Sequence, residues 1–478
     1  MSYSKLAVRG ALWSLLQVLA ERLTQTVVML TAALFLGPHD FGVAAMATAP
    51  ALIAASTLQT GNQMIVQRDE ATQHFLDTAF WLFLLLGAAC AVFVVGLALV
   101  FRAMPGYQTV WLMILPTALA PLLAAIGVVP EGLLMRTFAY RVLAIRKTVG
   151  QAIAGVACCG LAVYGFGAWS IVVQVTVAPI ISTAISLIAA KWRPRGVATF
   201  REMGSLTRFS GALLGWSMLN QVNVRSVDLV VGLIAGPTAT GVFRLARTVL
   251  DLATSLFMNP INGILLPIFS RMVGDRERTL EAMWQACGVA SVIAPVSFLG
   301  SAFASPFVSA VIFSNKWPHL SETVTLFLLS LPSVAVMVPV QTYLVASGRP
   351  KLPFFNNLYQ TIANVIMVAL GAWFGIIWAA GMFSLRCLLG AAALLVVLKR
   401  VSPDIRMTNQ AAATTVPLLV AVGIAVALHG VVWMLHLDLA KLVPALIMTT
   451  VAMLIYAGVS LVMFRAWIDF VIRAIRKR

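Results

Sequence analysis

Charged side chains recur along one apolar segment, residues 238–270, at spacings that place them on one face of a helix. At about 100° per residue, this polar face spans an arc of roughly 80°. Its members are Arg244, Arg247, Asp251, Ser255 and Asn262. Guanidinium groups match phosphate, pyrophosphate and acidic sugars because they donate parallel hydrogen bonds to such anions. A stripe of this kind inside an apolar helix is typical of a wall that faces a water-filled cavity.

Three more apolar segments carry ionisable or strongly polar side chains. They hold Glu21 and Arg22 in residues 10–36, Gln221, Arg225 and Asp228 in residues 207–235, and Arg386 in residues 376–398. Among these named residues of the four segments, five are arginines and three are carboxylates, which leaves an excess of two positive charges. Because an unpaired guanidinium in hydrocarbon is costly, this excess favours a hydrated cavity that binds an anion.

The spacing of the charges also predicts which of them form pairs. Asp228 and Arg244 both lie eight residues from Gly236, so two antiparallel helices that meet there would place them at one level. Arg247 can pair with Asp251 one turn along its own helix. These pairs have a second interpretation, in which they only hold helices together.

We expect two kinds of role for these side chains. The predicted substrate-binding residues are Arg22, Arg225, Arg244, Arg247, Arg386, Asn262 and Gln221. The candidates for ion coupling are Glu21, Asp228 and Asp251.

The segments that carry these residues belong to a membrane protein. Of the 478 residues, 61% are hydrophobic and only 10% are charged, against about 25% charged residues in soluble domains. This composition excludes a soluble enzyme, a nucleic-acid-binding domain and a disordered chain. A spanning helix needs about 20 apolar residues, and runs of this kind predict an all-α fold with fourteen membrane spans. Their approximate bounds are 10–36, 40–66, 77–101, 107–129, 143–164, 168–190, 207–235, 238–270, 284–304, 321–347, 354–373, 376–398, 414–435 and 442–464.

The basic residues predict the orientation of the chain. If the N-terminus is cytoplasmic, every Lys and Arg outside the spans lies on the cytoplasmic side except Arg102, Lys316 and Lys441. A missed crossing would invert all later loops, so the positive-inside rule supports both the count and the orientation. We therefore expect both termini in the cytoplasm and anionic lipid headgroups beside the basic loops.

A short motif predicts an internal repeat. The pattern GPxxxGV occurs at Gly37–Val43 and again at Gly236–Val242, 199 residues later. Because six helices per unit is an even number, both units would have the same orientation, as in transporters with two lobes around a central cavity. The predicted organisation is an N-terminal lobe at 1–190, a cytoplasmic linker at 191–206, a C-terminal lobe at 207–400, and two added helices with a basic tail at 401–478.

Motifs for catalysis or metal binding are missing from the sequence. There is no Walker loop, no HExxH pattern, no GxSxG elbow and no CxxC pair. We therefore predict no catalytic residues, no metal and no bound cofactor. Transport would then draw on an H⁺ or Na⁺ gradient, the membrane potential or the substrate gradient.

Several short motifs, spread over roughly residues 9–400, resemble those of a known family. They are Leu36–Gly42, Gln67-Arg68, Arg136–Arg141, Gly165–Ser170, Gly241–Arg247, Pro267–Arg271 and Ala346–Pro350. Together they resemble the polysaccharide transporter family, the Wzx-type flippases of lipid-linked oligosaccharides, and most closely its colanic-acid-exporter branch. This family belongs to the multidrug/oligosaccharidyl-lipid/polysaccharide exporter superfamily. A tyrosine of the family's Gly-x-Tyr segment is Phe243 here.

The resemblance implies a fold and a task. The fold is two six-helix lobes in a V around a cationic cavity, plus two extra helices. The task is to turn an undecaprenyl-pyrophosphate-linked oligosaccharide repeat unit across the bacterial inner membrane, for exopolysaccharide, O-antigen or capsule assembly. A polysaccharide polymerase or assembly complex would be a further partner, and no nucleic acid is expected.

Three other functions remain open from the sequence. A multidrug or other small-molecule exporter of the same superfamily would favour an acidic and aromatic cavity over surplus arginine. A membrane-embedded polymerase would present a sizeable outer loop, and the longest one, near residues 305–320, is short. A scaffold that transports nothing would tolerate loss of the buried charges.

Overall fold

The computed structural model describes most of the chain as helices. The described residues are 23–68, 70–196, 200–258, 265, 268–270, 272, 274–313, 315–349, 351–401 and 407–463. Within these ranges every regular element is helical, which confirms the predicted all-α class. Glu21, Arg22 and Asn262 lie outside the described residues.

The helices follow one another with short connections. In chain order, the helices up to residue 257 are α2 (Pro38–Gln59), α3 (Asn62–Gln67), α4 (Gln73–Ala103), α5 (Gln108–Thr117), α6 (Leu119–Arg136), α7 (Tyr140–Val163), α8 (Trp169–Ala190) and α9 (Phe200–Phe257). The second half has α11 (Arg276–Phe307), the π-helical turn η1 (Val308–Ile312), α12 (Leu320–Leu328), α13 (Leu331–Ala346), α14 (Lys351–Phe374), α15 (Ile376–Val401), α16 (Met407–Met434) and α17 (Leu442–Met463). A shorter apolar helix, Leu23–Phe35, precedes α2.

In the part of the chain that the structure describes, the predicted membrane spans correspond to helices. By length and composition, 11 helices among the described residues can cross a membrane. One of them, Leu213–Phe257, breaks at Gly236, whose φ of 85° and ψ of 172° are not helical, so it contains two spans. Helix α14 has 24 residues but is less apolar, and Leu23–Phe35 is the described part of the first span. The chain is thus a multi-pass membrane protein with about fourteen spans, as predicted.

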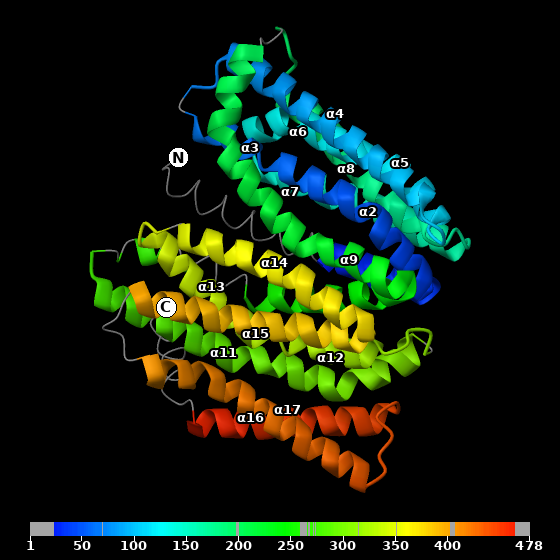
Figure 1. Ribbon diagram of the computed structural model, residues 1–478, viewed down its shortest axis with the longest axis vertical. Coiled ribbons are helices and arrows are strands. Elements are labelled where there is room, and N and C mark those ends of the chain that lie inside the picture. The colour runs from blue at the N-terminus through cyan, green and yellow to red at the C-terminus, as the bar shows by residue number, and fades with distance from the viewer. Residues whose placement is uncertain are drawn as a thin grey trace. The chain divides into compact units, whose positions relative to one another are not determined.

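The chain divides into two compact units, Met1–Arg244 and Leu245–Arg478. In the first unit α6 packs against α2, α4 and α8, and α7 pairs with α8. In the second unit α11 packs against α13, α16 and α17, while α15 packs against α14 (Figure 1). The predicted lobes at 1–190 and 207–400 remain a prediction.

The two copies of the GPxxxGV motif contact each other within the first unit. A Cβ atom on Gly42 would lie 1.7 Å from the carbonyl oxygen of Pro237, and a Cβ atom on Gly241 would lie 1.9 Å from the carbonyl oxygen of Pro38. The second glycine of each motif therefore makes room for the proline carbonyl of the other. This reciprocal backbone contact explains why both copies need glycine at that position.

The start of the predicted linker is fixed to α4. Lys191 ends α8 in the left-handed conformation, with φ 50°. The buried carboxylate of Asp77 then accepts hydrogen bonds from the backbone N–H groups of Arg195 (3.1 Å) and Gly196 (2.8 Å). The indole of Trp81 donates to the carbonyl oxygen of Gly196 at 2.8 Å. This part of the linker is held by specific hydrogen bonds.

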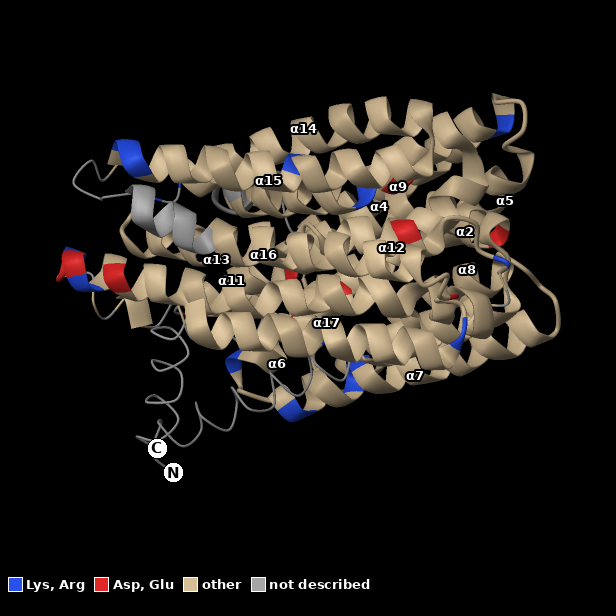
Figure 2. Cartoon of the chain, turned by 90° about the horizontal axis from the view of Figure 1, so that it is seen from below, with Lys and Arg blue, Asp and Glu red and all other residues tan. Residues whose placement is uncertain are grey.

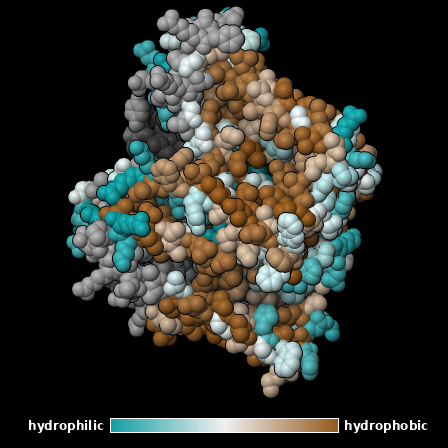
Figure 3. All heavy atoms as spheres, in the orientation of Figure 1, coloured by the Kyte–Doolittle hydropathy of each residue, from teal (hydrophilic) through white to brown (hydrophobic). Residues whose placement is uncertain are grey.

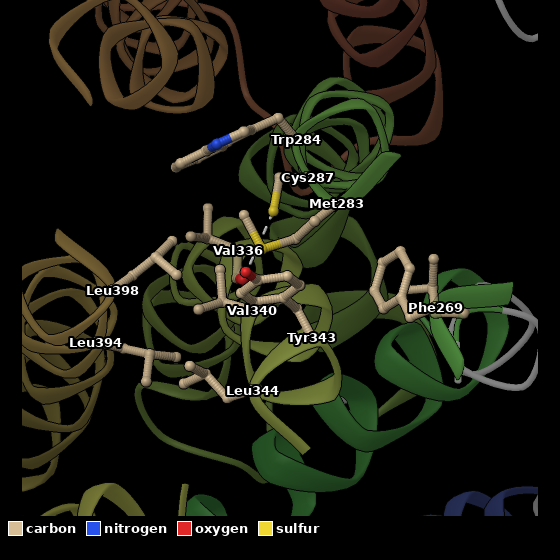
Figure 4. Packing of buried hydrophobic residues seen from close by; sticks show 11 residues of the cluster. Phe269, Met283, Trp284, Cys287, Val336, Val340, Tyr343, Leu344, Leu394 and Leu398 are labelled. Atoms are coloured by element: carbon tan, nitrogen blue, oxygen red, sulfur yellow. Dashed lines mark hydrogen bonds between the residues drawn. The ribbon is translucent and has the colours of Figure 1, made fainter. Parts of the chain in front are cut away.

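A hydrophobic cluster forms the core of the second unit. Met283 and Cys287 of α11 meet side chains of α13 and α15, and Figure 4 shows how they converge. The other labelled members of the cluster are Phe269, Trp284, Val336, Val340, Tyr343, Leu344, Leu394 and Leu398. Cys287 is fully buried there, and its thiol donates a weak hydrogen bond to the carbonyl oxygen of Val336 at 3.8 Å.

The outward surfaces of the helices are apolar. Large hydrophobic side chains such as Phe93, Trp373 and Val426 are exposed, and Figure 3 shows broad hydrophobic areas with hydrophilic residues toward the margins. In Figure 2 most of the ribbon is free of charged residues. Such surfaces suit lipid, so the few charges within the helices stand out as functional candidates.

Candidate functional site

Helices α14 and α15 form a tight hairpin that positions the most deeply buried arginine of the second unit. They meet at Gly375, whose φ of 118° is accessible to glycine. Near the turn, a Cβ atom on Gly371 would lie 2.6 Å from the carbonyl oxygen of Trp378, so the two helices approach closely. This close approach brings side chains of α14 into direct contact with those of α15.

Arg386 projects from the middle of α15 and is only 7% exposed. Its Nη1 donates to Oε1 of Gln360 on α14 at 2.5 Å, and its Nη2 lies 3.0 Å from the Cys387 sulfur. Its guanidinium carbon lies 4.8 Å from the centroid of the Phe383 ring. The Nε atom is buried and has no hydrogen-bond partner among the described residues. The charge of Arg386 is therefore held by a neutral amide, a weak sulfur acceptor and an aromatic face.

A second arginine shares the same aromatic ring. The guanidinium carbon of Arg247, on α9, lies 5.4 Å from the Phe383 centroid. Its Nε and Nη1 atoms are buried and lack hydrogen-bond partners in the described part of the chain. No carboxylate of the described residues forms a salt bridge with Arg247 or Arg386. Arg247, Phe383 and Arg386 thus form a cationic cluster, which we call the arginine–phenylalanine cluster.

Polar side chains of α14 extend this cluster along the hairpin. Asn356, Gln360 and Asn364 are spaced by four residues, which places them on one face of the helix, and all three are buried. The amide nitrogen Nδ2 of Asn356 has no hydrogen-bond partner among the described residues. This stripe was not among the predicted site residues, because its amides carry no charge. Three amides at a helical spacing in an apolar span would have been the signal.

The predicted pair at the Gly236 turn is present in the first unit. Arg244 Nη1 donates to Asp228 Oδ2 at 2.6 Å, and Asp228 is 2% exposed. The other carboxylate oxygen of Asp228, Oδ1, is buried and accepts no hydrogen bond within the described residues. The equal spacing of the two residues from the turn was sufficient to predict this contact.

The second predicted pair, between Arg247 and Asp251, is wrong. Asp251 is exposed, and the described residues contain no salt bridge between the two side chains. Arg247 instead lies over the Phe383 ring. An aromatic face on another helix replaced the carboxylate one turn away, which spacing along a single helix cannot reveal.

A buried ion pair in the first unit was not predicted. Arg146 of α7 donates from Nη1 to Glu131 Oε1 of α6 and to Ser186 Oγ of α8, the latter at 3.0 Å. Glu131 and Arg146 are 6% and 3% exposed. The predicted spans ended at residue 129 and resumed at 143, which left Glu131 in a cytoplasmic loop, and Arg146, near the start of the next span, was assigned to the cytoplasmic side. The helices in fact extend past these charges because the charges neutralise each other.

The other described residues of the predicted site are Gln221 and Arg225. They lie half-buried on α9, on the same helix as Asp228. Among the described residues there is no group of His, Cys, Asp and Glu that could hold a metal ion.

The comparisons with known proteins agree with this fold. Residues 32–322 match the family described as polysaccharide biosynthesis protein. The succinoglycan biosynthesis transport protein ExoT of Rhizobium meliloti (strain 1021) is 25% identical over 379 residues, covering 77% of this chain and 75% of ExoT. The lipopolysaccharide biosynthesis protein WzxC of Escherichia coli (strain K12) is 22% identical over 387 residues, covering 78% and 76%.

Solved structures show the same fold at low sequence identity. The lipid II flippase MurJ in an inward closed conformation aligns with a TM-score of 0.74 and 14% identity, covering 96% of this chain and 100% of MurJ. An inward-facing multidrug resistance MATE family transporter aligns with a TM-score of 0.62 and 14% identity, covering 80% and 96%. The family match spans more than half of the chain and confirms the resemblance seen in the motifs. This membrane protein therefore belongs to the polysaccharide biosynthesis protein family.

Proposed function

We propose that this chain is a flippase that turns a lipid-linked oligosaccharide across the bacterial inner membrane by alternating access. In this proposal Arg247 and Arg386 bind the pyrophosphate of the substrate. The observation that carries it is the arginine–phenylalanine cluster, where two guanidinium groups lie over one ring without a carboxylate partner in the described chain.

The energetics of buried charge favour an anionic ligand at this cluster. Removing a charge from water costs several kcal/mol unless other groups compensate it. The Phe383 ring compensates by about 2 kcal/mol at a desolvated site, and a neutral amide adds one hydrogen bond. An anion with several oxygens would satisfy the buried Nε and Nη1 atoms and offset the like-charge repulsion between the arginines.

The family supplies the class of substrate. Relatives named for succinoglycan transport and lipopolysaccharide biosynthesis support an undecaprenyl-pyrophosphate-linked repeat unit, with the products exported as cell-surface polysaccharide. In this proposal the termini are cytoplasmic, the basic loops contact anionic lipids, and a polymerase or assembly complex takes over the flipped unit. The chain is then a transporter and performs no catalysis.

The remaining predicted residues have proposed roles along the same path. Arg22, Arg225, Arg244, Gln221 and Asn262 would contact the substrate as it passes. Glu21, Asp228 and Asp251 would couple transport to H⁺ or Na⁺, and the unpartnered Oδ1 of Asp228 supports a site for a cation or proton at that residue.

A multidrug exporter is the second candidate, because MATE transporters share the fold. Many drugs exported by such a transporter would be cations or aromatic molecules. The arginine–phenylalanine cluster would repel a cation, so the charge of the cluster favours the oligosaccharide flippase over this alternative.

Export of polysaccharide by a strain that lacks the chromosomal gene tests the proposal. Plasmid-borne Arg386→Ala and Arg247→Ala should each lower the exported polymer about 10- to 150-fold, since hydrogen bonds to a charged group contribute about 1.5–3 kcal/mol. Arg386→Lys keeps the charge but loses the fork of N–H donors, and should retain intermediate export.

Arg102→Ala is the matched control. Arg102 also stacks on an aromatic ring, that of Trp111 at 5.2 Å, but it is exposed at the end of α4. It should export at the wild-type level. Immunoblots of membranes must show equal amounts of every variant. Wild-type export by both Arg386→Ala and Arg247→Ala would refute the proposed role of the cluster.

A further inference from the structure

Arg146, Arg244 and Arg386 each donate a hydrogen bond from Nη1 to the side chain of another residue. Arg146 bonds to Glu131 and Arg244 bonds to Asp228, so in both cases the acceptor is a carboxylate. Arg386 bonds to Gln360, so in this case the acceptor is a carboxamide. In all three contacts Nη1 donates to a side-chain oxygen, but only the neutral carboxamide of Gln360 leaves the positive charge of its arginine uncompensated.

Glutamine and glutamate would have different effects at position 360, because both Gln360 and Arg386 are buried. Glutamate has nearly the same size and would form a buried ion pair with Arg386, as Glu131 does with Arg146. Such a pair has no net charge and little attraction for an anion. Glutamine orients the guanidinium by a hydrogen bond and keeps the full positive charge for another partner.

The packing around Gln360 fixes the direction of its amide. A Cβ atom on Gly390, one turn along α15 from Arg386, would lie 1.5 Å from Nε2 of Gln360, so the amide fills the space left by the missing side chain. Nε2 also lies 4.0 Å from the Met337 sulfur. If the amide were reversed, Nε2 would face the Nη1 donor of Arg386, which is unfavourable because both groups donate. Oε1 is therefore directed at Arg386.

We propose that Gln360, seated against Gly390, is a positioning residue that orients Arg386 toward the anionic group of the substrate while leaving its charge unneutralised. This inference rests on the proposed function of the arginine–phenylalanine cluster. It adds two uncharged residues to the site. Gln360 is a neutral hydrogen-bond acceptor, and Gly390 leaves the space that the Gln360 amide fills.

Gln360→Glu is the sharpest test because it changes charge without changing shape. The purified full-length chain in detergent is titrated with inorganic pyrophosphate, and the rise in melting temperature gives the affinity. The variant should melt at or above the wild-type temperature without pyrophosphate, because it gains a buried ion pair with Arg386. Its affinity for pyrophosphate should fall at least 10-fold, and polymer export should fall with it.

A purely structural role predicts the opposite pattern. If Arg386 only holds α14 to α15, Gln360→Glu preserves the contact, and pyrophosphate affinity and export stay within twofold of wild type, which would overturn the inference. Gln285→Glu, which adds the same charge near the start of α11 beside the exposed Glu281, is the matched control and should bind as wild type does.

Two further variants keep the test decisive. If Gln360→Glu fails to fold, Gln360→Met retains the volume and removes the strong acceptor. Weaker pyrophosphate binding by Gln360→Met supports the inference, and unchanged binding overturns it. Gly390→Ala displaces the amide and should also weaken binding. Arg386→Ala tests the arginine–phenylalanine cluster itself. If Arg386→Ala loses export while Gln360→Glu exports and binds pyrophosphate as wild type does, this inference is refuted and the proposed function stands.

Discussion

Replacing Gly42 with alanine tests the reciprocal contact between the two GPxxxGV motifs. The added Cβ atom would lie 1.7 Å from the carbonyl oxygen of Pro237, whereas ordinary contacts begin at 3.4 Å. Helix α2 and the second half of α9 would therefore have to separate locally by about 1.7 Å. Backbone atoms cannot rotate away as a flexible side chain can, so the strain falls on the packing of both helices.

The size of the effect follows from two losses. Overpacking of a dense interior costs about 1–3 kcal/mol, and the Cα–H···O contact that glycine permits contributes about 0.5–1 kcal/mol. For a unit of this size the melting temperature should fall by roughly 3–16 °C. A thiol-reactive dye can follow unfolding of the purified chain, because its cysteines are free and Cys158, Cys287 and Cys387 are buried.

The motif provides its own controls. Gly37 precedes α2 and has nothing within 4 Å of a built Cβ atom, so Gly37→Ser should leave the melting temperature nearly unchanged. Gly241→Ala should act like Gly42→Ala, since its Cβ atom would lie 1.9 Å from the Pro38 carbonyl oxygen. The double variant should be less destabilised than the sum of the two, because one separation of the helices relieves both clashes. Equal melting temperatures for Gly42→Ala and Gly37→Ser would refute the reasoning.

Two further predictions concern buried carboxylates in the first unit. Glu131→Ala leaves Arg146 charged and buried, and should lower the free energy of unfolding by about 3–5 kcal/mol. Adding Arg146→Met removes the unpaired charge and should recover much of this loss, as measured by thermal unfolding in detergent. A double variant no more stable than Glu131→Ala would contradict this account. Asp77→Ala removes the acceptor for the backbone N–H groups of Arg195 and Gly196. Trypsin should therefore cut after Arg195 several-fold faster than in wild type while leaving the rest of the chain intact. An unchanged cleavage rate would show that Asp77 does not hold the linker.

The approximate positions of the membrane spans could be predicted from the sequence because a helix needs a minimum length of apolar residues to cross the bilayer. The cytoplasmic side of the loops stays a prediction from the positive-inside rule. The same logic misplaced Glu131 and Arg146, since charges were used to mark the ends of spans. A mutually neutralising pair can lie inside a span, and no property of either residue alone distinguishes it from a loop charge.

The candidate site could be predicted only in part, for a related reason. The contact between Arg244 and Asp228 could be predicted because both residues lie eight positions from the same turn at Gly236. The partner of Arg386 lies 26 residues away on another helix, and the partner of Arg247 is an aromatic ring. Contacts of this kind depend on which faces of α9, α14 and α15 meet, and spacing within one helix carries no information on that.

Arg146, Arg244, Arg247 and Arg386 differ in whether a carboxylate compensates their charge. In the first unit Arg146 and Arg244 each bond to a carboxylate, so each contributes no net charge to its surroundings. In the second unit Arg247 and Arg386 share Phe383, and their acceptors in the described chain are uncharged. A count of charges cannot separate these cases, because a guanidinium beside a carboxylate is already compensated, whereas in the proposed function a guanidinium beside glutamine keeps its charge for an anion. The identity of the neighbouring acceptor therefore says more about the role of a buried arginine than the presence of the arginine does.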